Sequence, residues 1–494
     1  MSMAHGSIPT LDTILKAHAA RHPDAPALVD PPDCALITGK APRRWNYRQA
    51  DCAVGAIAAR LREIGLAPGA VVGLQMPNVS TGILTLLAIM RAGMIAAPLP
   101  LLWRRSDCVA ALSAAGTRAI VTCGRVAGFD HAALALEVAA ELFPIRAVCG
   151  FNCAGDDGIV PLDDLLDGPD EHPDSILFQD TDSAPLALVT FEVTTGGIMP
   201  VARDATQLLA GGRLIRQRGT IAPSAVILSM LPAMSYAGLS AALVPWLLSG
   251  GTLVLHHPFD PDALRTQIEC ERADVLVVPD AMLPGLSTSG WLEPLSLQSV
   301  VAVWRAPERL AAAAQWTNLD VTLMDVAAFG ETALLAARRP PGGRTLPWPL
   351  GPVAIGSGGD PSADVALTPG GTLGVSGALA ASPYRPYGDD EPADASTARG
   401  HVDTRYPCRL AGNTLVVTAP PADIVAVGGY RFAMHDLQHM VRGLDAHGVL
   451  AALPHAVCGH RLAGHATDPV TMRNMLETMG INPLLTAAFR NRAA

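Results

Sequence analysis

Helix-length amphipathic segments alternate with short, largely apolar segments of strand length over the first 150 residues. Helices are predicted at Leu11–Arg21, Tyr47–Ile64 and Leu84–Ala92, where apolar residues recur at helical spacing and proline or glycine marks the ends. The apolar segments between them, such as Val71–Gln75, are typical of strands that are covered on both faces. The alternation returns over residues 225–279. This pattern predicts layered α/β units with mostly parallel sheets.

The character of the chain changes toward its C-terminus. From Thr372 the predicted strands shorten and glycine, proline and aspartate become more frequent, which indicates a β-rich subdomain. Pro420 and Pro421 can continue neither a helix nor a central strand. We therefore predict a large N-terminal domain over residues 1–420 and a small, mobile α+β unit over residues 421–494, called the lid below.

Composition excludes several classes of protein. The 494 residues include 35 lysines and arginines against 45 acidic residues, a formal net charge of −10, so nucleic acid is not an expected partner. The apolar stretch of residues 82–102 is interrupted by Arg91, Gly93 and Pro98, which indicates a buried helix and strand instead of a membrane span. The nine cysteines lack zinc-site spacing and no signal peptide opens the chain, so we expect a cytoplasmic protein.

A series of short motifs runs in order along the chain. The clearest is Leu188-Val-Thr-Phe-Glu-Val-Thr-Thr-Gly-Gly-Ile-Met-Pro-Val201, which has the outline of a phosphate-binding loop. Others occur at residues 68–78, 91–98, 231–238, 250–254, 304–307, 329–333, 400–406 and 427–429. Together they resemble the acyl-CoA synthetase, adenylation-domain and luciferase (ANL) superfamily over nearly the whole chain. That resemblance implies a large adenylate- and acyl-binding domain followed by a mobile lid.

Members of this superfamily work in two steps. A carboxylate first attacks the α-phosphate of ATP, which gives an acyl-adenylate and pyrophosphate. The lid then rotates, and the thiolate of CoA displaces AMP. The two steps need different groups, so the residues that are lost and retained in this chain can be assigned to one step or the other.

The loop that would hold the β- and γ-phosphates of ATP is altered. Aligned on residues 194–196, the superfamily's loop serine falls at Glu192, its first glycine at Val193 and its lysine at Met199. Glu192 places a negative charge beside the phosphates, and each like-charge contact at about 4 Å costs roughly 4 kcal/mol in a surface-like dielectric. Val193 stiffens the backbone, and Met199 removes a cation.

Other groups of the first step are missing too. Lys16 and Lys40 are the only lysines in the sequence, so the catalytic lysine that the superfamily carries near its C-terminus is absent. By the same resemblance, the magnesium-binding glutamate corresponds to Ala333, with Glu331 as the only local substitute, and the ribose-binding aspartate corresponds to Tyr406.

The groups implied for the second step remain. Thr332 aligns with the threonine that contacts the α-phosphate, and Phe329 aligns with the aromatic residue that stacks on adenine. Gly428 and Gly429 align with the backbone that lines the pantetheine passage, where only residues without a side chain leave room for the thiol arm.

The resemblance thus implies a set of site residues. The catalytic residues would be Thr332 and Gly429, and CoA would be bound by Val427, Gly428, Gly429 and Arg431. The adenylate would be bound by Thr194, Thr195, Gly196, Arg305, Ala306, Pro307, Phe329, Gly330 and Thr332. The acyl pocket would be formed by Met234, Ser235, Tyr236, Gly238, Trp304, Ala327 and Ala328.

We expect a non-adenylating acyl-CoA ligase that transfers the acyl group of a preformed acyl-adenylate to CoA, releases AMP and needs no metal. A separate adenylating enzyme would supply the adenylate. The pattern of losses resembles the non-adenylating diterpenoid acyl-CoA ligases of platensimycin and platencin biosynthesis, an antibiotic pathway, which implies a bulky tetracyclic diterpene acid as the acyl group.

Two other functions are open at the level of sequence. The chain could be a complete ATP-dependent ligase in which arginines such as Arg203 or Arg490 replace the missing lysines. It could instead be a catalytically inactive binding or scaffold protein.

Single residues also have plainer interpretations. Glu192 could be a solvated residue of a reshaped turn, and Thr332 could be a turn hydroxyl. Gly428 and Gly429 could form an ordinary hairpin, and residues 235–236 could serve packing alone.

Overall fold

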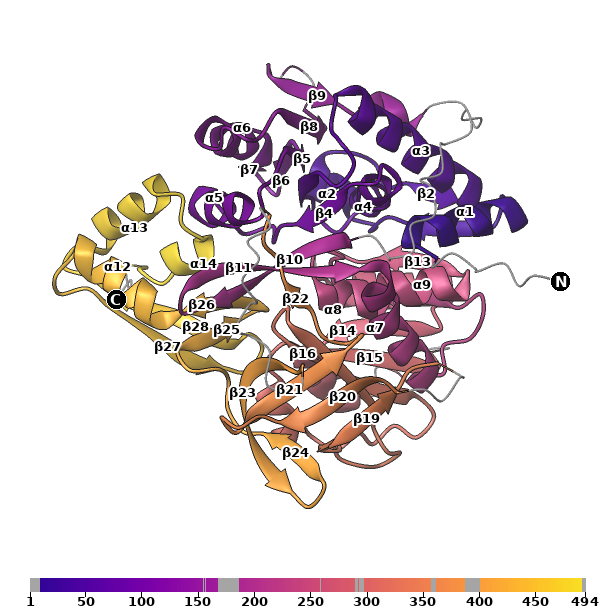
Figure 1. The fold of residues 1–494 in the computed structure, drawn as a ribbon, viewed down its shortest axis with the longest axis vertical. Coiled ribbons are helices and arrows are strands. Elements are labelled where there is room, and N and C mark those ends of the chain that lie inside the picture. The colour runs from indigo at the N-terminus through magenta and orange to yellow at the C-terminus, as the bar shows by residue number, and fades with distance from the viewer. Residues whose placement is uncertain are drawn as a thin grey trace.

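The computed structural model describes residues 9–153, 155, 157–167, 186–257, 259–288, 292, 297–356, 361–386 and 400–490. Two α/β units are stacked in the large domain, with an all-β unit below them and the lid at one side (Figure 1). This arrangement confirms the predicted fold class of layered α/β units, a β-rich subdomain and a small α+β unit.

The first α/β unit is built on an eight-stranded sheet in the order β22-β11-β10-β4-β3-β5-β8-β9. The six strands from β10 to β9 run parallel, and the hairpin partner β11 and the edge strand β22 run antiparallel. The strand bounds are β3 (Val71–Gln75), β4 (Ile95–Pro98), β5 (Ala119–Cys123), β8 (Ala147–Phe151), β9 (Ile159–Pro161), β10 (Leu186–Thr194), β11 (Gly197–Asp204) and β22 (Ser382–Pro383).

The helices of this unit are α1 (Leu11–Arg21), α2 (Cys34–Thr38), α3 (Tyr47–Glu63), α4 (Ser80–Arg91), α5 (Arg105–Ala114) and α6 (His131–Glu141), with a small ribbon of β6 (Arg125–Val126) and β7 (Phe129–Asp130).

Helix α4 corresponds to the helix predicted at Leu84–Ala92 and begins four residues earlier than predicted. The carboxylate of Asp30 accepts a 2.6 Å hydrogen bond from the Ser80 N–H, so a residue distant in sequence satisfies a donor of the first turn.

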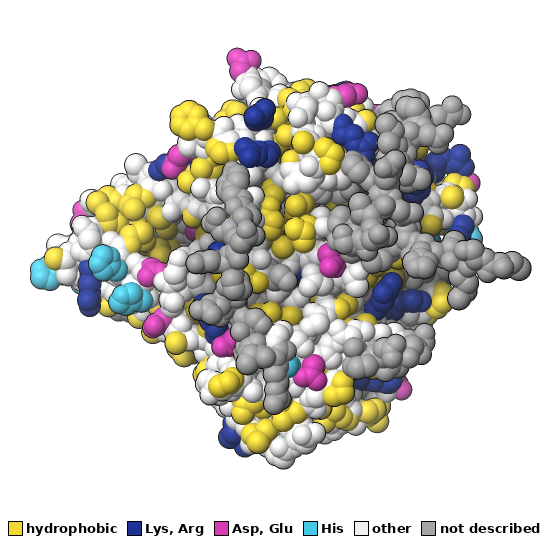
Figure 2. Space-filling model, in the orientation of Figure 1, with side chains coloured by type: hydrophobic (Ala, Val, Ile, Leu, Met, Phe, Trp, Pro, Cys, Tyr) yellow, Lys and Arg dark blue, Asp and Glu magenta, His cyan; other side chains and the backbone are white. Residues whose placement is uncertain are grey.

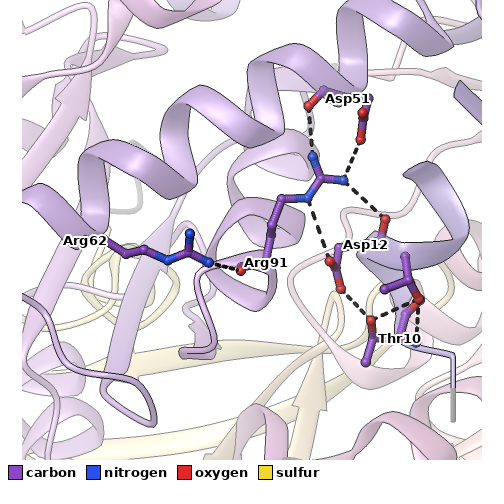
Figure 3. Close-up of polar contacts among 6 residues, drawn as sticks. Thr10, Asp12, Asp51, Arg62 and Arg91 are labelled. Carbon is purple, nitrogen blue, oxygen red and sulfur yellow. Dashed lines mark hydrogen bonds and ion pairs between the residues drawn. The ribbon is translucent and has the colours of Figure 1, made fainter. Parts of the chain in front are cut away.

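Arg91 fastens three helices of this unit to one another. Its guanidinium donates to the Asp51 carboxylate at 2.6 Å and to the Asp51 and Asp12 carbonyl oxygens at 2.9 and 3.2 Å, and its own carbonyl accepts from Arg62 (Figure 3). The Asp12 carboxylate lies 3.7 Å from the Arg91 Nε. A buried cation is thus neutralised by residues of α1 and α3, which holds α4 against these two helices.

The second α/β unit has an eight-stranded sheet in the order β17-β16-β15-β14-β12-β13-β1-β2. All neighbours pair in parallel except the edge strands β2 and β17. The strand bounds are β1 (Pro26–Val29), β2 (Arg44–Asn46), β12 (Val226–Ser229), β13 (Thr252–Leu255), β14 (Val275–Pro279), β15 (Ser299–Trp304), β16 (Thr322–Phe329) and β17 (Ala333–Arg338). Its helices include α7 (Ala205–Arg218), α8 (Tyr236–Gly238), α9 (Val244–Ser249), α10 (Pro261–Glu271) and α11 (Leu283–Thr288).

The predicted β-rich subdomain is an antiparallel six-stranded sheet in the order β18-β24-β23-β21-β20-β19. The strand bounds are β18 (Trp348–Pro349), β19 (Gly351–Ala354), β20 (Pro361–Leu367), β21 (Thr372–Gly377), β23 (Val402–Ala411) and β24 (Thr414–Val417).

The lid is a four-stranded antiparallel sheet covered by short helices. Its elements are β25 (Ile424–Val427), β26 (Tyr430–Ala433), α12 (Met434–Leu444), β27 (Val449–His455), β28 (Gly459–His465), α13 (Pro469–Thr478) and α14 (Pro483–Thr486). A core of its own runs from Val427 to Phe489, and histidine side chains gather on its surface (Figure 2). The boundary at residue 420 stays a prediction.

None of the helices in the described ranges combines the length and apolar character that a bilayer crossing requires.

A buried polar network holds the segment that follows β4. The Gln75 amide nitrogen donates to the Pro100 and Trp103 carbonyl oxygens at 3.1 and 3.2 Å, so its oxygen faces Nδ1 of His131 at 3.2 Å. Because that oxygen can only accept, Nδ1 carries a proton. Burial and, to a lesser extent, the nearby Arg104 lower the pKa of His131 to about 4, so the ring is neutral near pH 7.

Acid should therefore destabilise the fold through His131. The unfolded imidazole gains a proton below about pH 6.5, whereas the folded one gains it only near pH 4, so stability falls as the pH drops through this window. His131→Asn keeps a donor toward Gln75 but cannot titrate. Between pH 7 and pH 5 the wild type should lose roughly 1–3 kcal/mol more of unfolding free energy than this variant, measured by urea denaturation.

The exposed His447→Asn is the matched control for the loss of one imidazole. Equal losses in the wild type and His131→Asn would show that the ring is not held neutral.

Candidate functional site

A cavity of about 660 Å³ lies between the two α/β units and the lid. The loops that line it follow the carboxyl ends of β3 and β4 in one sheet and of β12, β14, β15 and β16 in the other. The lid closes it with the hairpin of β25 and β26 and with residues 457–459. Crevices at the carboxyl ends of parallel strands are the usual ligand sites of open α/β sheets.

The cavity wall is mainly apolar and has two parts. One part comes from the second sheet and includes Met230, Leu231, Met234, Val303 and Ala328. The other comes from the first sheet and includes Met76, Pro98, Trp103, Phe129, Phe191 and Val193. A wall of this kind accepts an apolar molecule and fixes it with a few polar groups.

The predicted phosphate-binding loop is a tight hairpin in the structure. β10 and β11 remain paired up to Thr194 and Gly197, which leaves a turn of only Thr195 and Gly196. The Thr194 hydroxyl donates to the Gly197 carbonyl oxygen at 2.9 Å and accepts from the Gly196 N–H at 3.1 Å, while Thr195 and Gly196 are exposed. These groups are used within the turn, so no flexible loop is available there to wrap a polyphosphate.

Glu192 lies in the paired part of β10 and is buried, so it is not a solvated turn residue. Its carboxylate accepts from the Arg431 guanidinium of the lid and from the Glu331 N–H. The two side chains of the ion pair are only 7% and 12% exposed. Burial raises the pKa of the Glu192 carboxyl, whereas Arg431 and the Glu331 amide lower it. Burial opposes the charge of Arg431, but Glu192 and other acidic groups raise the pKa of its guanidinium overall.

A second buried cation continues this network inward. The Arg203 guanidinium donates to the Thr190 hydroxyl at 3.2 Å and to the Glu331 carbonyl oxygen, and it lies 3.5 Å from the centre of the Tyr236 ring. The Glu331 carboxylate accepts from the Tyr236 N–H at 2.9 Å. Burial lowers the pKa of the Arg203 guanidinium. Two carboxylates and two guanidiniums are therefore clustered beside the cavity.

Phe329 and Tyr406 contact each other edge to face. Their ring centroids are 5.3 Å apart, the rings are inclined at 82°, and both side chains are buried. The Arg431 guanidinium lies 5.8 Å from the Tyr406 centroid. The aromatic ring predicted to stack on adenine thus contacts Tyr406, the residue predicted to align with the ribose-binding aspartate.

Several hydrogen bonds hold the lid against the large domain. Arg305 donates to the Gly429 carbonyl oxygen at 3.3 Å and to the Ser235 hydroxyl, and Arg309 donates to the Ala456 carbonyl oxygen at 3.2 Å. The Leu102 N–H donates to the Tyr430 hydroxyl at 3.2 Å.

The structure brings part of the predicted site together. Nine of the predicted residues line the cavity, namely Met234, Ser235, Ala328, Arg305, Ala306, Gly330, Gly428, Gly429 and Arg431. Of the described residues, those predicted to bind but found outside the cavity wall are Thr194, Thr195, Gly196, Pro307, Phe329, Thr332, Tyr236, Gly238, Trp304, Ala327 and Val427.

The side chains outside the wall have other contacts. The Trp304 indole donates to the Asp325 carboxylate at 2.9 Å, and the Thr332 hydroxyl donates to the Phe329 carbonyl oxygen at 2.6 Å. The hydroxyl of Thr332 is therefore bonded within its own turn, as the plainer interpretation of this residue anticipates.

Sequence reasoning missed the wall formed by the first sheet. Trp103, Phe129 and Phe191 belong to three separate segments of that unit, and apolar residues in such segments are indistinguishable from core residues by pattern alone. It also missed that Arg431 pairs with Glu192. The sequence did contain one signal for this pair. Glu192 is an isolated carboxylate in an apolar strand, and a buried carboxylate requires a cation beside it.

The chain is similar to known proteins over much of its length. The profile of the family described as AMP-binding enzyme matches residues 15–337. The chain is 25% identical to the 2-hydroxy-7-methoxy-5-methyl-1-naphthoate--CoA ligase of Streptomyces carzinostaticus, in an alignment that covers 92% of this chain and 83% of that protein. It is 32% identical to bovine (Bos taurus) long-chain fatty acid transport protein 1 over 36% of this chain, and this match spans only 24% of the bovine protein.

Solved structures show the same fold. The amide bond synthetase McbA from Marinactinospora thermotolerans superposes with a TM-score of 0.70 at 19% identity, covering 97% of this chain and 94% of that one. The Mycobacterium smegmatis MbtA apo structure superposes with a TM-score of 0.64 at 17% identity, covering 96% and 89%.

The profile match spans well over half of the chain. The chain therefore belongs to the AMP-binding enzyme family of the ANL superfamily.

Proposed function

We propose that this protein is an acyl-CoA ligase that carries out only the second half of the usual reaction. It takes a preformed acyl-adenylate from a separate adenylating enzyme in the cytoplasm, transfers the acyl group to CoA and releases AMP. The observation that carries this proposal is the buried Glu192, which is paired with Arg431 beside the cavity.

The residues do not fit a magnesium–triphosphate group. Glu192 is an anion where the phosphates would lie, the hairpin turn has only two residues, and Met199 supplies no cation. The Glu331 carboxylate, the only local substitute for a magnesium ligand, accepts from the Tyr236 N–H. Phosphoryl transfer depends on positioning and on neutralising charge, and neither is supported here.

The arginines that could replace the missing lysines are unsuited to that role. Arg203 is 1% exposed and is bonded to Thr190 and Glu331. Arg490 is exposed near the end of the described chain. The described residues that line the cavity include neither of them. These placements favour the thioester-forming step over complete ATP-dependent ligation.

The lid presents the groups that the second step needs. Gly428 and Gly429 face the cavity with φ angles of 56° and 88°, which suit glycine. In the proposed step the sulfur of CoA attacks the acyl carbonyl carbon, the C–S bond forms, and the C–O bond to AMP breaks with its electron pair leaving on AMP. The thiol proton passes to solvent. An adenylate already has an activated leaving group, so no further phosphate chemistry is needed.

Binding of the adenylate requires a local rearrangement. Phe329 can stack on adenine only after the Tyr406 ring moves off it, and Tyr406 is in turn packed beside Arg431. Entry of the nucleotide is therefore coupled to movement at the junction between the large domain and the lid.

The acyl group that fits best is a bulky polycyclic acid. The cavity is large and mainly apolar, and its wall extends over both sheets. One similar protein, from Streptomyces carzinostaticus, is named as a CoA ligase for a substituted naphthoate. Another, from Mycobacterium tuberculosis (strain ATCC 25618 / H37Rv), is named as a CoA ligase for a bicyclic indene-type propanoyl group. The second protein is 27% identical in an alignment that covers 49% of this chain and 48% of that protein. The tetracyclic diterpene acid expected from the sequence is one acid of this class.

The pure protein should form thioester from acyl-adenylate but not from ATP. With a polycyclic acid, ATP, magnesium and CoA, neither pyrophosphate exchange nor thioester should appear, because the phosphates would meet Glu192. The synthetic adenylate of the same acid with CoA and EDTA should give equal amounts of acyl-CoA and AMP, measured by mass spectrometry.

ATP–pyrophosphate exchange that depends on the added acid would show that the protein is a complete ATP-dependent ligase. Failure with every adenylate offered, linear or polycyclic, would favour a binding or scaffold protein, for which the burial of Phe329 against Tyr406 is the structural argument.

The route of CoA can be tested at Ala426. A side chain at Gly429 would strain the backbone at φ 88° and place its Cβ 3.0 Å from Arg305. A substitution there would therefore combine local strain with obstruction of CoA, and the two effects could not be separated. Ala426 also lines the cavity from β25. Ala426→Trp should reduce turnover with CoA by at least about tenfold, the equivalent of roughly 1.4 kcal/mol, and leave adenylate affinity within about twofold.

Ala451→Trp is the matched control, because Ala451 is an exposed position of the same lid sheet. Normal turnover by Ala426→Trp would show that CoA enters elsewhere.

A further inference from the structure

Two donors from different parts of the chain converge on the Glu192 carboxylate. Arg431 reaches it from the lid and donates to Oε1, and the backbone N–H of Glu331 donates to Oε2. A guanidinium and a backbone amide aimed at one point form the kind of arrangement that binds phosphate oxygens. Here the anion that they bind belongs to the protein.

This anion site opens onto the cavity. Gly330, Glu331 and Arg431 all line the cavity wall, and the Glu192 carboxylate accepts from two of them, Arg431 and the Glu331 N–H. A Cβ added at Gly330 would overlap both the Arg431 guanidinium and the Glu192 carboxylate. The backbone at Gly330 has φ 60°, so the absence of a side chain permits both the turn and the close approach of the two charges.

The same contact joins the lid to the large domain. Among the described residues, the other hydrogen bonds across this junction are accepted by neutral groups, such as those from the N–H of Leu102 to the Tyr430 hydroxyl and from the N–H of Ser106 to the Gly480 carbonyl oxygen at 3.1 Å. A buried pair of opposite charges contributes more to orientation than these bonds, because separating it leaves both charges without a partner.

We propose that Glu192 is a built-in anion that docks the lid in the absence of nucleotide, by occupying a site on Arg431 and the Glu331 amide that otherwise takes a phosphate group. In the wild type the carboxylate fills this site, so free inorganic phosphate does not enter it. Removal of the carboxylate leaves an anion site that inorganic phosphate can fill. This inference goes beyond the proposed function and does not require acyl transfer, since lid docking can be followed without any substrate.

Hydrogen–deuterium exchange of residues 101–106 reports docking, because the Leu102 and Ser106 amides donate to lid residues. Glu192→Gln keeps the shape of the side chain and removes its charge. Exchange of this segment should become at least about tenfold faster, since breaking a buried ion pair from one side shifts an equilibrium by more than a decade. Glu271→Gln is the matched control, because it breaks the Arg44–Glu271 pair within the large domain.

Inorganic phosphate should separate the variant from the wild type. At constant ionic strength, added phosphate should slow exchange of the segment in Glu192→Ala, which also vacates the space of the carboxylate, in a saturable way and leave the wild type unchanged. A wild-type rate in Glu192→Gln would show that Glu192 does not hold the lid. Failure of phosphate to restore protection, or equal protection of both proteins, would show that no vacated anion site exists.

If Glu192→Gln does not fold, as judged by circular dichroism, Arg431→Gln tests the same contact from the lid. It should also accelerate exchange of residues 101–106, but phosphate should not reverse the effect because the guanidinium is gone. Reversal by phosphate in Arg431→Gln would overturn the assignment of Arg431.

Discussion

The buried ion pair between Glu192 and Arg431 is the interaction on which the arrangement of this protein depends. A carboxylate in the middle of a paired, buried strand is costly unless a cation reaches it, and the cation comes from the lid. Removing one partner of such a pair costs about 3–5 kcal/mol. The charge at position 192 therefore fixes where the lid sits, and with it the position of the glycine hairpin that faces the cavity.

The charges beside the cavity balance within the protein. Arg431 and Arg203 are cations, Glu192 and Glu331 are anions, and each contacts at least one of the others or its backbone. The protein thus supplies both signs itself, and the same buried ion pair underlies both the proposed loss of ATP chemistry and the proposed docking of the lid.

The sequence predicted the layered architecture well because that architecture depends on local pattern. The predicted bounds are correct for helix α1 (Leu11–Arg21) and strand β3 (Val71–Gln75). Helical spacing and unbroken apolar runs involve only residues that are close in the sequence, so they can be recognised without the structure. The site was predicted less completely. Glu192 finds its partner 239 residues away, and no pattern around Glu192 indicates which arginine will reach it. Phe329 was predicted to stack on adenine, but its contact with Tyr406 depends on how two sheets meet.

The change from loop to hairpin concerns the backbone as well as the side chains. Met199 stands directly opposite Glu192 in the ladder of β10 and β11, and residues so placed project from the same face about 5 Å apart. A lysine at position 199 would therefore meet Glu192 before it met any phosphate, and it would compete with Arg431 for that carboxylate. The strand pairing that buries Glu192 would thus turn a restored lysine toward the protein's own anion. Recovery of a phosphate loop needs the hairpin to unpair, because only then do its backbone donors become free to bind a ligand.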